Sequence, residues 1–565
     1  MCTVETVLPP QQITVFGKWR FCSVGRCSAQ IPNLTTKRLF LLSSIRFRAD
    51  SLFIPSEEST SSGIPRWEAI TYKQFYDDVE LCAKYWAREL SSLVPLRSVV
   101  GLWIGGLTYT DVLHIYAISR AGYIPQLFSL RLPNPAIIYE LLAKANASAL
   151  VCDPLTSGFI DGNCTVPVLH APFLAEIDLA LSSESSPSLP ACEPSDCAFI
   201  FHTSGSTSGS PKLVPCNYRW LDAVARKASQ TAVPRDSDRQ DVTTCVGSMC
   251  HIGQTMLLIC LMQYGTCIIQ PKRIPFPTEE LVNMIRFGNL NRLWQFATFF
   301  SVHLKAARKD SNLLSLLVNL EEVTTCGMAL SQEDEAFAYK SGIKLKNIFG
   351  STECGGTTLV SVGGSDPTIR HHLRPLQGLS YAFVPITSTA DEHQSTARLL
   401  EFVVLSDSGD CPDVSLRQSD GHFHTGDLFQ EVGPGSYIFA GRDDDWIKTE
   451  NSLRCDTKSI EDNARAMCGT LISECIAVGT GRPFPALFVE AGSELDEVKL
   501  KKEIFRKIRH FHSRRYIHES IVSPKMIIVV PKGTLPRTAS KGNIRRKAVE
   551  EAYKSRLDEL YASGN

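Results

Sequence analysis

Short apolar runs and segments of helical periodicity alternate along most of the chain. Ala69–Tyr72 has the composition of a short strand, and Val99–Ile104 is continuously apolar, as in a parallel strand that is covered on both faces. Between them, Lys73–Leu90 carries apolar residues at helical spacing, which predicts a helix. The alternation of strands and helices continues with a predicted helix at Thr110–Ala121 and a predicted strand at Ala149–Cys152. The pattern therefore predicts an α/β fold with largely parallel sheets.

Polar segments separate further strands in the later part of the chain. Residues 180–195 are rich in Ser and Pro, which predicts a connecting loop. Ala198–Phe201 reads as a buried strand that leads into a loop of Gly and Ser. Further strands are predicted at Leu399–Leu405, Tyr437–Ala440, Ala486–Glu490 and Met526–Val530.

A cluster of charges at Gly441–Asp445 follows an apolar strand and marks a domain boundary. About 120 residues remain beyond it, enough for one small α+β domain. We therefore expect a basic N-terminal extension at 1–47, a large N-terminal domain of α/β subdomains at 48–441, and a small mobile C-terminal domain at 442–565.

Composition narrows the classes of partner. Of the 565 residues, 44% are hydrophobic and 21% are charged, and the formal net charge is -1. Such a balance creates no overall field that would attract nucleic acid or an acidic membrane surface. The sequence has no run of 18 or more apolar residues, so it predicts no transmembrane helix. A small-molecule partner is favoured over a polyanion.

The cysteines and the N-terminal segment bear on location. The 19 cysteines are irregularly spaced with no paired C-x-x-C, which argues against a zinc framework or a disulfide scaffold. We interpret them as buried, reduced thiols of an intracellular protein, cytoplasmic by preference, with the peroxisome or mitochondrion as alternatives. Residues 1–47 hold six basic residues and one acid, as in a transit peptide. They lack a clean amphipathic Arg period, so a disordered or loosely docked extension is the preferred interpretation.

A loop of hydroxyls and glycines follows the strand that ends at His202. Thr203–Lys212 reads T-S-G-S-T-S-G-S-P-K. Glycines let backbone N–H groups approach phosphate oxygens, hydroxyls donate further hydrogen bonds, and Lys212 supplies positive charge. The segment does not match the Walker pattern G-x-x-x-x-G-K-[ST]. It predicts phosphate binding, with a flexible surface loop as the alternative.

This loop resembles the ATP-pyrophosphate loop of the adenylate-forming superfamily. That group includes acyl- and aryl-CoA ligases, luciferases and the adenylation domains of non-ribosomal peptide synthetases. The loop is one residue longer than usual between its first glycine and the Pro-Lys pair, but Gly205 and Lys212 remain recognisable. The resemblance covers residues 60–560. It implies ATP contacts from this loop by Thr203, Ser204, Gly205, Ser206, Thr207 and Gly209.

A second segment, Asn347–Glu353, resembles the family's aromatic-Gly-x-Thr-Glu motif. In the family the aromatic ring packs near adenine, the threonine touches phosphate and the glutamate helps to hold magnesium. One carboxylate is enough, because magnesium keeps water and phosphate oxygens as its other ligands. An isolated Thr-Glu pair could equally begin a helix. The resemblance implies magnesium binding by Glu353 and nucleotide contacts by Phe349 (in place of the usual Tyr), Gly350, Ser351 and Thr352.

Two further motifs match in the same order along the chain. Thr425–Asp427 resembles the nucleotide-binding aspartate motif, and both oxygens of an ionised Asp427 can accept hydrogen bonds from ribose hydroxyls. A plain Gly-Asp turn is the alternative. Gly441–Lys448 resembles the interdomain hinge segment, which implies that Arg442 donates to the ribose and Asp444 is the pivot. A solvated charged loop is the alternative there.

The last match, Leu535–Lys547, resembles the C-terminal loop that carries the family's catalytic lysine. The common order is Gly-Lys, whereas this chain has Lys541-Gly542; some fungal reductase-like relatives show the same reversal. Lys541 is therefore the candidate, and Lys547 is its rival. Thr449–Arg454 departs from the glycine-containing turn of CoA ligases, which leaves the thiol acceptor open.

Residues around the expected acyl pocket bear on the choice of acid. Met249–Gly253 lies where amino-acid-activating relatives place an Asp for the α-ammonium group, and this window contains no Asp. We therefore expect an aryl or aliphatic acid and not an α-amino acid. His251 either gates the pocket or caps a helix. The other lining candidates are mostly small, apolar or aromatic, and lie in Thr298–Ser301, Cys354–Gly356 (with Gly355 at its centre) and the run Gly327, Met328 and Ala329.

The motifs together imply a two-step reaction. The carboxylate attacks the α-phosphorus of ATP, with Lys541 and magnesium offsetting charge and Lys212 assisting the leaving pyrophosphate. The catalytic set is therefore Lys541, Thr352, Glu353 and Lys212. A rotation about Asp444 then admits the thiol. Because no carrier domain follows Lys541 in this sequence, free CoA is the expected acceptor, with a carrier protein in trans as the alternative. A non-catalytic nucleotide- or acyl-binding relative is the rival from another class.

Overall fold

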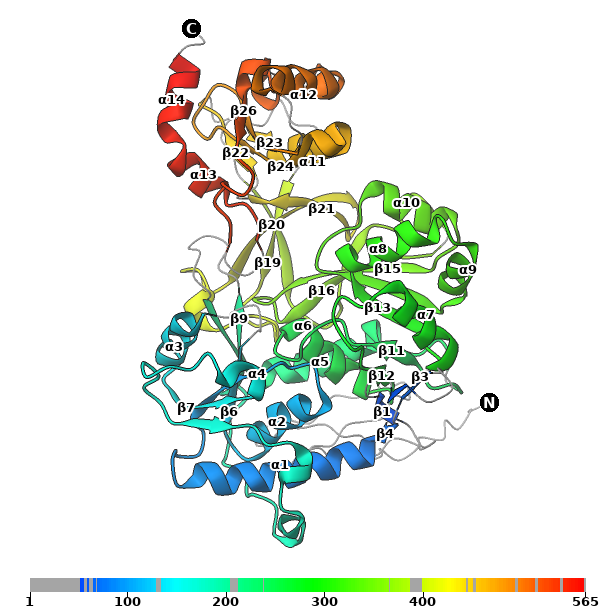
Figure 1. Cartoon of the computed structure of the whole chain (residues 1–565), viewed down its shortest axis with the longest axis vertical. Helices are drawn as coiled ribbons and strands as arrows, with labels where there is room; N and C mark the ends of the chain where they lie inside the picture. Colours follow the sequence, from blue (N-terminus) through cyan, green and yellow to red (C-terminus); the bar gives the residue numbers. More distant parts are fainter. Residues whose placement is uncertain are drawn as a thin grey trace, which may run out of the picture. The chain divides into compact units, whose positions relative to one another are not determined.

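The computed structural model (Figure 1) forms two compact units. The first contains the described residues up to Thr203 and those within Lys212–Tyr381 and Val404–Phe423; the second contains the described residues within Ala382–Val403 and from His424 onward. The predicted division at 441/442 falls within the second unit and stays a prediction. The structure describes residues 51–54, 58–59, 65–67, 69–128, 134–203, 212–236, 238–364, 366–386, 399–443, 446–450, 454–492, 496–513, 517–538 and 542–562. The predicted extension at 1–47 lies outside them.

Three sheets organise the first unit. A six-stranded sheet has the order β10 (Lys212–Asn217), β9 (Cys197–Thr203), β6 (Ile124–Leu127), β5 (Val99–Trp103), β7 (Ala147–Cys152) and β8 (Val168–His170). A four-stranded sheet has the order β11 (Val242–Thr244), β12 (Cys267–Ile269), β1 (Ser51–Ile54) and β4 (Ile70–Thr71). The third contains β13 (Arg292–Phe296), β14 (Glu322–Cys326), β15 (Leu345–Ser351), β16 (Gly356–Ser361) and β17 (Leu373–Pro375).

Helices link these strands, and most strand pairs are parallel, as the sequence predicts. The helices of the first unit are α1 (Tyr72–Ser91), α2 (Tyr109–Arg120), α3 (Pro135–Lys144), α4 (Pro154–Ser157), α5 (Tyr218–Thr231), α6 (Ile252–Met262), α7 (Thr278–Phe287), α8 (Ala297–Ala307), α9 (Ser311–Asn319) and α10 (Gln332–Lys340). Short strands β2 (Glu58–Ser59) and β3 (Pro65–Arg66) pair with each other.

Local sequence explains where these elements begin and what they bury. Thr71 caps α1 by accepting from the Gln74 N–H at 3.1 Å, which satisfies one of the free N–H groups of the first turn. The apolar stripe that predicted this helix, including Phe75 and Trp86, is buried. Residues 100–103 of β5 are all buried, so both faces of that strand are covered, as its continuous apolar run indicates.

Buried charged side chains form ion pairs at the N-terminal ends of β13 and β14. Arg292 lies 2.9 Å from Asp241 and 2.9 Å from Glu322. Burial raises the pKa of Glu322, but Lys346 and Arg292 more than offset this effect, so the pKa lies below its ordinary value. These charges are therefore paired inside the fold, at the ends of the strands opposite the predicted nucleotide motif in β15.

The second unit combines a strand meander with a small α+β assembly. The meander has the order β21 (Ser436–Arg442), β20 (Phe423–Gly433), β19 (Leu399–Val404) and β18 (Tyr381–Pro385). The assembly contains β22 (Trp446–Lys448), β23 (Arg454–Asp456), β24 (Ile472–Val478), β25 (Ala486–Ala491), β26 (Ile527–Val530), α11 (Thr457–Cys468), α12 (Glu497–His512), α13 (Arg546–Ala552) and α14 (Lys554–Ala562). Its core contains apolar residues of α11, α12 and the three-stranded sheet β24-β25-β26. The predicted α+β character is confirmed.

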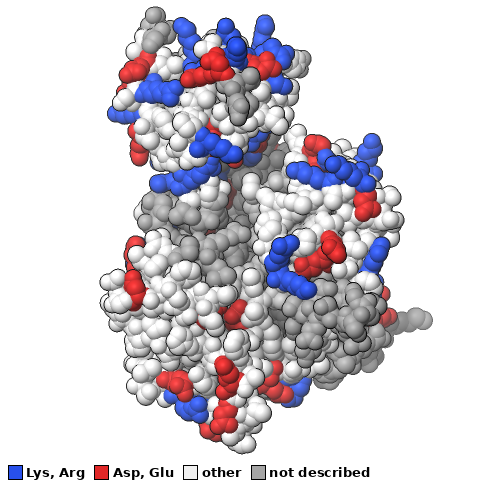
Figure 2. Space-filling model, in the orientation of Figure 1, with Lys and Arg blue, Asp and Glu red and all other residues white. Residues whose placement is uncertain are grey.

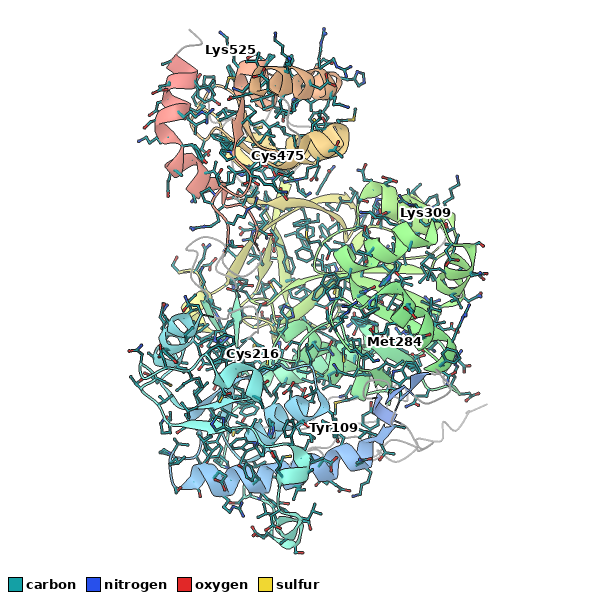
Figure 3. All side chains as sticks on the ribbon, in the orientation of Figure 1. Tyr109, Cys216, Met284, Lys309, Cys475 and Lys525 are labelled. Atoms are coloured by element: carbon teal, nitrogen blue, oxygen red, sulfur yellow. The ribbon has the colours of Figure 1, made fainter. Side chains whose placement is uncertain are left out.

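The cysteines, the surface charges and the helix lengths can be compared with the sequence predictions within the described residues. The described cysteines are free and most are buried; Cys216 in the first unit and Cys475 in the second are labelled in Figure 3. Basic and acidic side chains are mixed on the face drawn in Figure 2, with several of the basic ones over α12. No helix in the described ranges is long and apolar enough to cross a bilayer.

Candidate active site

The segment that is predicted to bind phosphate lies between the two strands of an antiparallel hairpin. Thr203 ends β9, Lys212 begins β10, and the two residues are partners across the hairpin. The predicted contacts at Ser204, Gly205, Ser206, Thr207 and Gly209 lie outside the described residues. The side chain of Lys212 is exposed, and in the part of the chain that the structure describes it has no ion-pair partner. A cation is therefore available where the loop returns to the sheet.

A histidine that the sequence motifs do not include anchors this hairpin. His202 Nδ1 lies 2.9 Å from the Leu127 carbonyl oxygen, so it donates there and leaves Nε2 to accept from the Gln126 amide at 3.1 Å. Its ring stacks on Phe128 with centroids 4.8 Å apart. Burial lowers the pKa of His202 to about 4. A neutral imidazole thus links β9 to β6 directly before the loop.

The predicted nucleotide motif forms the turn between β15 and β16. Ser351 Oγ accepts from the Cys354 N–H at 3.2 Å, which closes the turn. A Cβ at Gly350 would stand 2.0 Å from the Gly356 carbonyl oxygen, so this position requires glycine. Phe349, Ser351, Thr352 and Glu353 are all half-buried. The predicted motif residues are therefore brought together by one tight backbone turn.

The donor set of this turn fits magnesium. The carboxylate of Glu353 has neither a hydrogen bond nor an ion pair among the described residues. No group of three or more His, Cys, Asp or Glu in those residues could enclose a metal ion. A single unpaired carboxylate suits an ion that takes most of its oxygen ligands from water and phosphate. Glu353 is thus a fitting protein ligand for magnesium bound to a nucleotide.

The two predicted ribose ligands meet on one hairpin of the second unit. Asp427 in β20 and Arg442 in β21 are cross-strand partners, and Arg442 Nη1 lies 3.2 Å from Asp427 Oδ1. Asp427 is buried. Glu401 supports the motif from β19, because it accepts from the Gly426 N–H at 3.0 Å and lies 2.9 Å from His424 Nδ1. Sequence patterns did not identify Glu401, whose role depends on strand pairing.

Two of the predicted pocket residues, His251 and Gly327, lie beside an aromatic ring that the sequence analysis did not name. Phe296, at the end of β13, lies edge-on to His251 with centroids 6.1 Å apart. Gly327 has a φ of 82°, and a Cβ there would stand 2.7 Å from Phe296 Cδ1. Met328 and Ala329 are exposed. His251, Gly327 and Phe296 therefore form one small surface, whereas Gly355 is buried against Trp220.

His251 caps a helix, which is one of its two predicted roles. Its Nδ1 accepts from the Gly253 N–H at 3.1 Å at the start of α6. We expect His251→Ala to lower the free energy of unfolding by about 1 kcal/mol and His251→Asn to restore most of it, because Asn is a good helix cap. Denaturant unfolding of both variants measures this. An Asn variant as unstable as the Ala variant would contradict the cap, and a changed acid KM in a stable Asn variant would support the gate.

The remaining predicted residues are not placed. Asp444 and Lys541 lie outside the described residues. The rival Lys547 lies on α13 with its side chain exposed. The pivot and the catalytic lysine therefore stay predictions.

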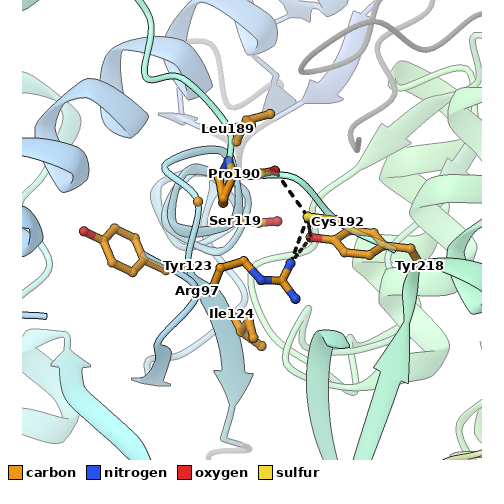
Figure 4. Close-up of a pocket in the computed structure, with 9 residues that line it drawn as sticks. Arg97, Ser119, Tyr123, Ile124, Leu189, Pro190, Cys192 and Tyr218 are labelled. Carbon is orange, nitrogen blue, oxygen red and sulfur yellow. Dashed lines mark hydrogen bonds between the residues drawn. The ribbon is translucent and has the colours of Figure 1, made fainter. Parts of the chain in front are cut away.

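A small pocket in the first unit contains none of the predicted site residues (Figure 4). Arg97 Nη1 lies 2.8 Å from Cys192 Sγ, and Cys192 Sγ lies 3.6 Å from the Tyr218 hydroxyl. Arg97 also pairs with Asp196 at 3.2 Å. These contacts fasten the Ser- and Pro-rich connection to the start of α5, which is a structural role.

Comparison with known proteins places the chain in a family. The model of the AMP-binding enzyme family matches residues 56–387, and that of the AMP-binding enzyme C-terminal domain matches residues 444–565. The AMP-binding domain-containing enzyme iboA of Amanita muscaria (strain Koide BX008) is 36% identical over 489 residues, which cover 84% of this chain and 92% of iboA.

More distant similarity extends to longer enzymes and to solved structures. The adenylate-forming reductase stbB of Stachybotrys bisbyi is 23% identical over 80% of this chain, which spans 41% of stbB. The crystal structure of ATP-bound MatB from Rhodopseudomonas palustris superposes with a TM-score of 0.66 at 16% identity, covering 90% of this chain and 96% of MatB. This likeness confirms the fold. The matched ranges and the similarity to iboA show that the chain belongs to the AMP-binding enzyme family of adenylate-forming enzymes.

Proposed function

We propose that this protein uses ATP to convert a carboxylic acid into its acyl-adenylate, releases pyrophosphate, and transfers the acyl group to a thiol, for which CoA is the first candidate. The observation that carries the proposal is the pairing of Asp427 with Arg442 on one hairpin, 3.2 Å apart. A buried carboxylate beside a guanidinium presents acceptors and donors to the two hydroxyls of a ribose. Membership in the AMP-binding enzyme family supports this assignment.

Each further group has a defined part in the proposed reaction. The Thr203–Lys212 hairpin holds the β- and γ-phosphates, and Lys212 offsets charge on the departing pyrophosphate. Phe349 offers a ring face to adenine. Magnesium, when bound by Glu353 and phosphate oxygens, neutralises part of the negative charge that the carboxylate must approach. Lys541 stabilises the charge that develops on the α-phosphate as the acid attacks.

The surface around Phe296 favours an acid without an α-amino group. His251, Phe296 and Gly327 contribute aromatic and small groups, and the window Met249–Gly253 offers no carboxylate to an ammonium ion. An ammonium ion that loses its hydration without a partner raises the free energy of binding. Aryl and aliphatic acids are therefore the proposed substrates.

Matched pairs of acids test this preference. We expect pyrophosphate release to depend on added acid and to be about tenfold or more faster with an acid than with its α-amino counterpart, since a buried unpaired ammonium ion forfeits hydrogen bonds to water. Leucine against 4-methylpentanoic acid and phenylalanine against 3-phenylpropanoic acid differ by the amino group. An α-amino acid that proves the best substrate would refute the preference. ATP binding without acid-dependent pyrophosphate release would identify a non-catalytic relative.

Product analysis separates the two proposed acceptors. The acyl-adenylate formed in place is offered CoA or a phosphopantetheine-bearing carrier protein, and the thioester is identified by mass spectrometry. Formation of acyl-CoA at a rate close to that of adenylation supports CoA. Exclusive loading of the carrier would establish the stand-alone adenylation function instead.

A further inference from the structure

A buried ion pair lies behind the Glu353 turn and takes part in none of the predicted chemistry. Lys227 Nζ, from α5, lies 2.7 Å from Asp410 Oδ1, and both side chains are fully buried. Asp410 belongs to the segment after β19, and its Oδ2 accepts a hydrogen bond from the hydroxyl of Tyr381 at the start of β18. Three segments that are distant in the sequence thus meet at one carboxylate.

This pair is costly to bury. Lys227 Nζ makes no well-directed hydrogen bond to the described residues, although the charges are close. Burial raises the pKa of Asp410, and Lys227 opposes the rise. An apolar pair of similar volume usually stabilises a core as well as, or better than, a buried ion pair. The pair therefore calls for an explanation other than stability.

The pair and its helix contact the turn that carries Glu353. Trp220 lies on the same buried face of α5 as Lys227 and donates its indole N–H to the Gly355 carbonyl oxygen at 2.9 Å. A Cβ at Gly355 would stand 2.5 Å from the Trp220 ring and 3.4 Å from Asp410 Oδ1. The backbone at Gly355, with a φ of 66°, therefore lies directly against α5 and Asp410.

We propose that Lys227, Asp410 and Tyr381 are positioning residues that lock the Glu353–Gly356 turn against α5 and so hold the Glu353 carboxylate in place for a nucleotide-bound magnesium ion. The inference rests on the proposed function for the role of Glu353. It extends that function to three residues that do not touch substrate. Removing an outer partner of a metal ligand typically weakens metal binding or activity by about 10–100-fold.

The test replaces the ion pair with an apolar pair of similar size. We compare Lys227→Met/Asp410→Leu with a matched control, Arg120→Met/Glu80→Leu, which removes another buried ion pair of the same unit (2.6 Å) that lies between α1 and α2. Thermal unfolding and hydrogen exchange of the peptide 349–357 are measured for both. The magnesium concentration that gives half-maximal acid-dependent ATP–pyrophosphate exchange is measured as well.

We expect Lys227→Met/Asp410→Leu to remain folded and its amide hydrogens in 349–357 to exchange about tenfold faster than those of the parent. We also expect the variant to require about tenfold more magnesium, because a metal ligand that loses its outer partner binds the metal more weakly. The control should change neither the exchange of this peptide nor the magnesium requirement. If the folded variant kept the hydrogen exchange or the magnesium requirement of the parent, the proposal would be wrong. Amide hydrogen exchange tests the positioning of the turn independently of the enzyme assay. If the parent shows no acid-dependent ATP–pyrophosphate exchange, the proposed function is wrong, and amide hydrogen exchange still decides whether the turn is held in place.

A milder variant covers the case in which the double variant does not fold. Tyr381→Phe removes one hydrogen bond to Asp410 and leaves the ion pair intact. We expect the same two changes, in the same direction and smaller, since one neutral donor is lost. Unchanged hydrogen exchange at 349–357 in this folded variant would overturn the proposal.

Discussion

Lys541→Ala should nearly abolish formation of the acyl-adenylate while leaving thioester formation from a supplied acyl-adenylate intact. Loss of one preorganised electrostatic donor usually slows a reaction by about 10²–10³, or about 2.7–4 kcal/mol. In the proposed mechanism the lysine offsets charge on the α-phosphate in the first half-reaction, and a domain rotation removes it before the second. The two half-reactions should therefore respond very differently. Single-turnover kinetics of each half-reaction measures this.

Lys547→Ala is the matched control, because Lys547 belongs to the same basic stretch and its side chain is exposed on α13. An exposed cation contributes little, so both half-reactions should stay within a few-fold of the parent. If Lys547→Ala is the variant that loses adenylation, the reversed Lys541-Gly542 pair has been aligned incorrectly. If Lys541→Ala slows both half-reactions equally, the lysine supports the fold or the nucleotide, and the two-conformation mechanism is wrong for this protein.

Asp427→Ala should weaken ATP binding much more than acid binding. A lost charged hydrogen-bond partner costs about 1.5–3 kcal/mol, which is about 10–150-fold in affinity. The structure adds a second contribution, because the substitution also removes the carboxylate 3.2 Å from Arg442. The KM values for ATP and for the acid, determined separately, show whether the two affinities change together.

Asp427→Asn and Arg442→Lys separate these contributions. Asn keeps the shape and one acceptor of Asp427 but loses the charge, so its ATP affinity should lie between those of the parent and the Ala variant. Arg442→Lys keeps a charge but loses the planar fork. An unchanged apparent ATP affinity in Asp427→Ala would remove the basis of the ribose assignment, and an equal rise in both KM values would point to a general loss of structure.

Elements with strong periodicity could be predicted from the sequence. The stripe along Lys73–Leu90 gave the position of α1 to within about a residue at each end, because an amphipathic helix is specified locally. The run at Val99–Ile104 gave β5 with its two covered faces. The motifs around Phe349 and Asp427 could be found because each places a glycine and a carboxylate within a few residues, at the spacing of the family's motifs.

Contacts between distant segments could not be predicted in this way. Strand pairing places His202 beside β6 and Glu401 beside the Asp427 motif. Phe296 contacts His251 and Gly327, which come from other parts of the chain. Lys227 and Asp410 are far apart in sequence, and each alone looks like a surface charge. A pattern that extends over a few residues carries no information about such partners, whereas the fold brings them within hydrogen-bond distance.

The neutral imidazole of His202 makes the anchoring of the β9–β10 hairpin sensitive to acid. An unfolded histidine binds a proton near pH 6.5, whereas the folded pKa is about 4. The stabilisation from this residue is therefore complete above pH 6.5 and declines as the pH falls toward 4, because unfolding then takes up a proton. A loss of activity in that range thus has a source in the scaffold, and cannot be assigned to a reacting group until the stability of the hairpin has been followed over the same range.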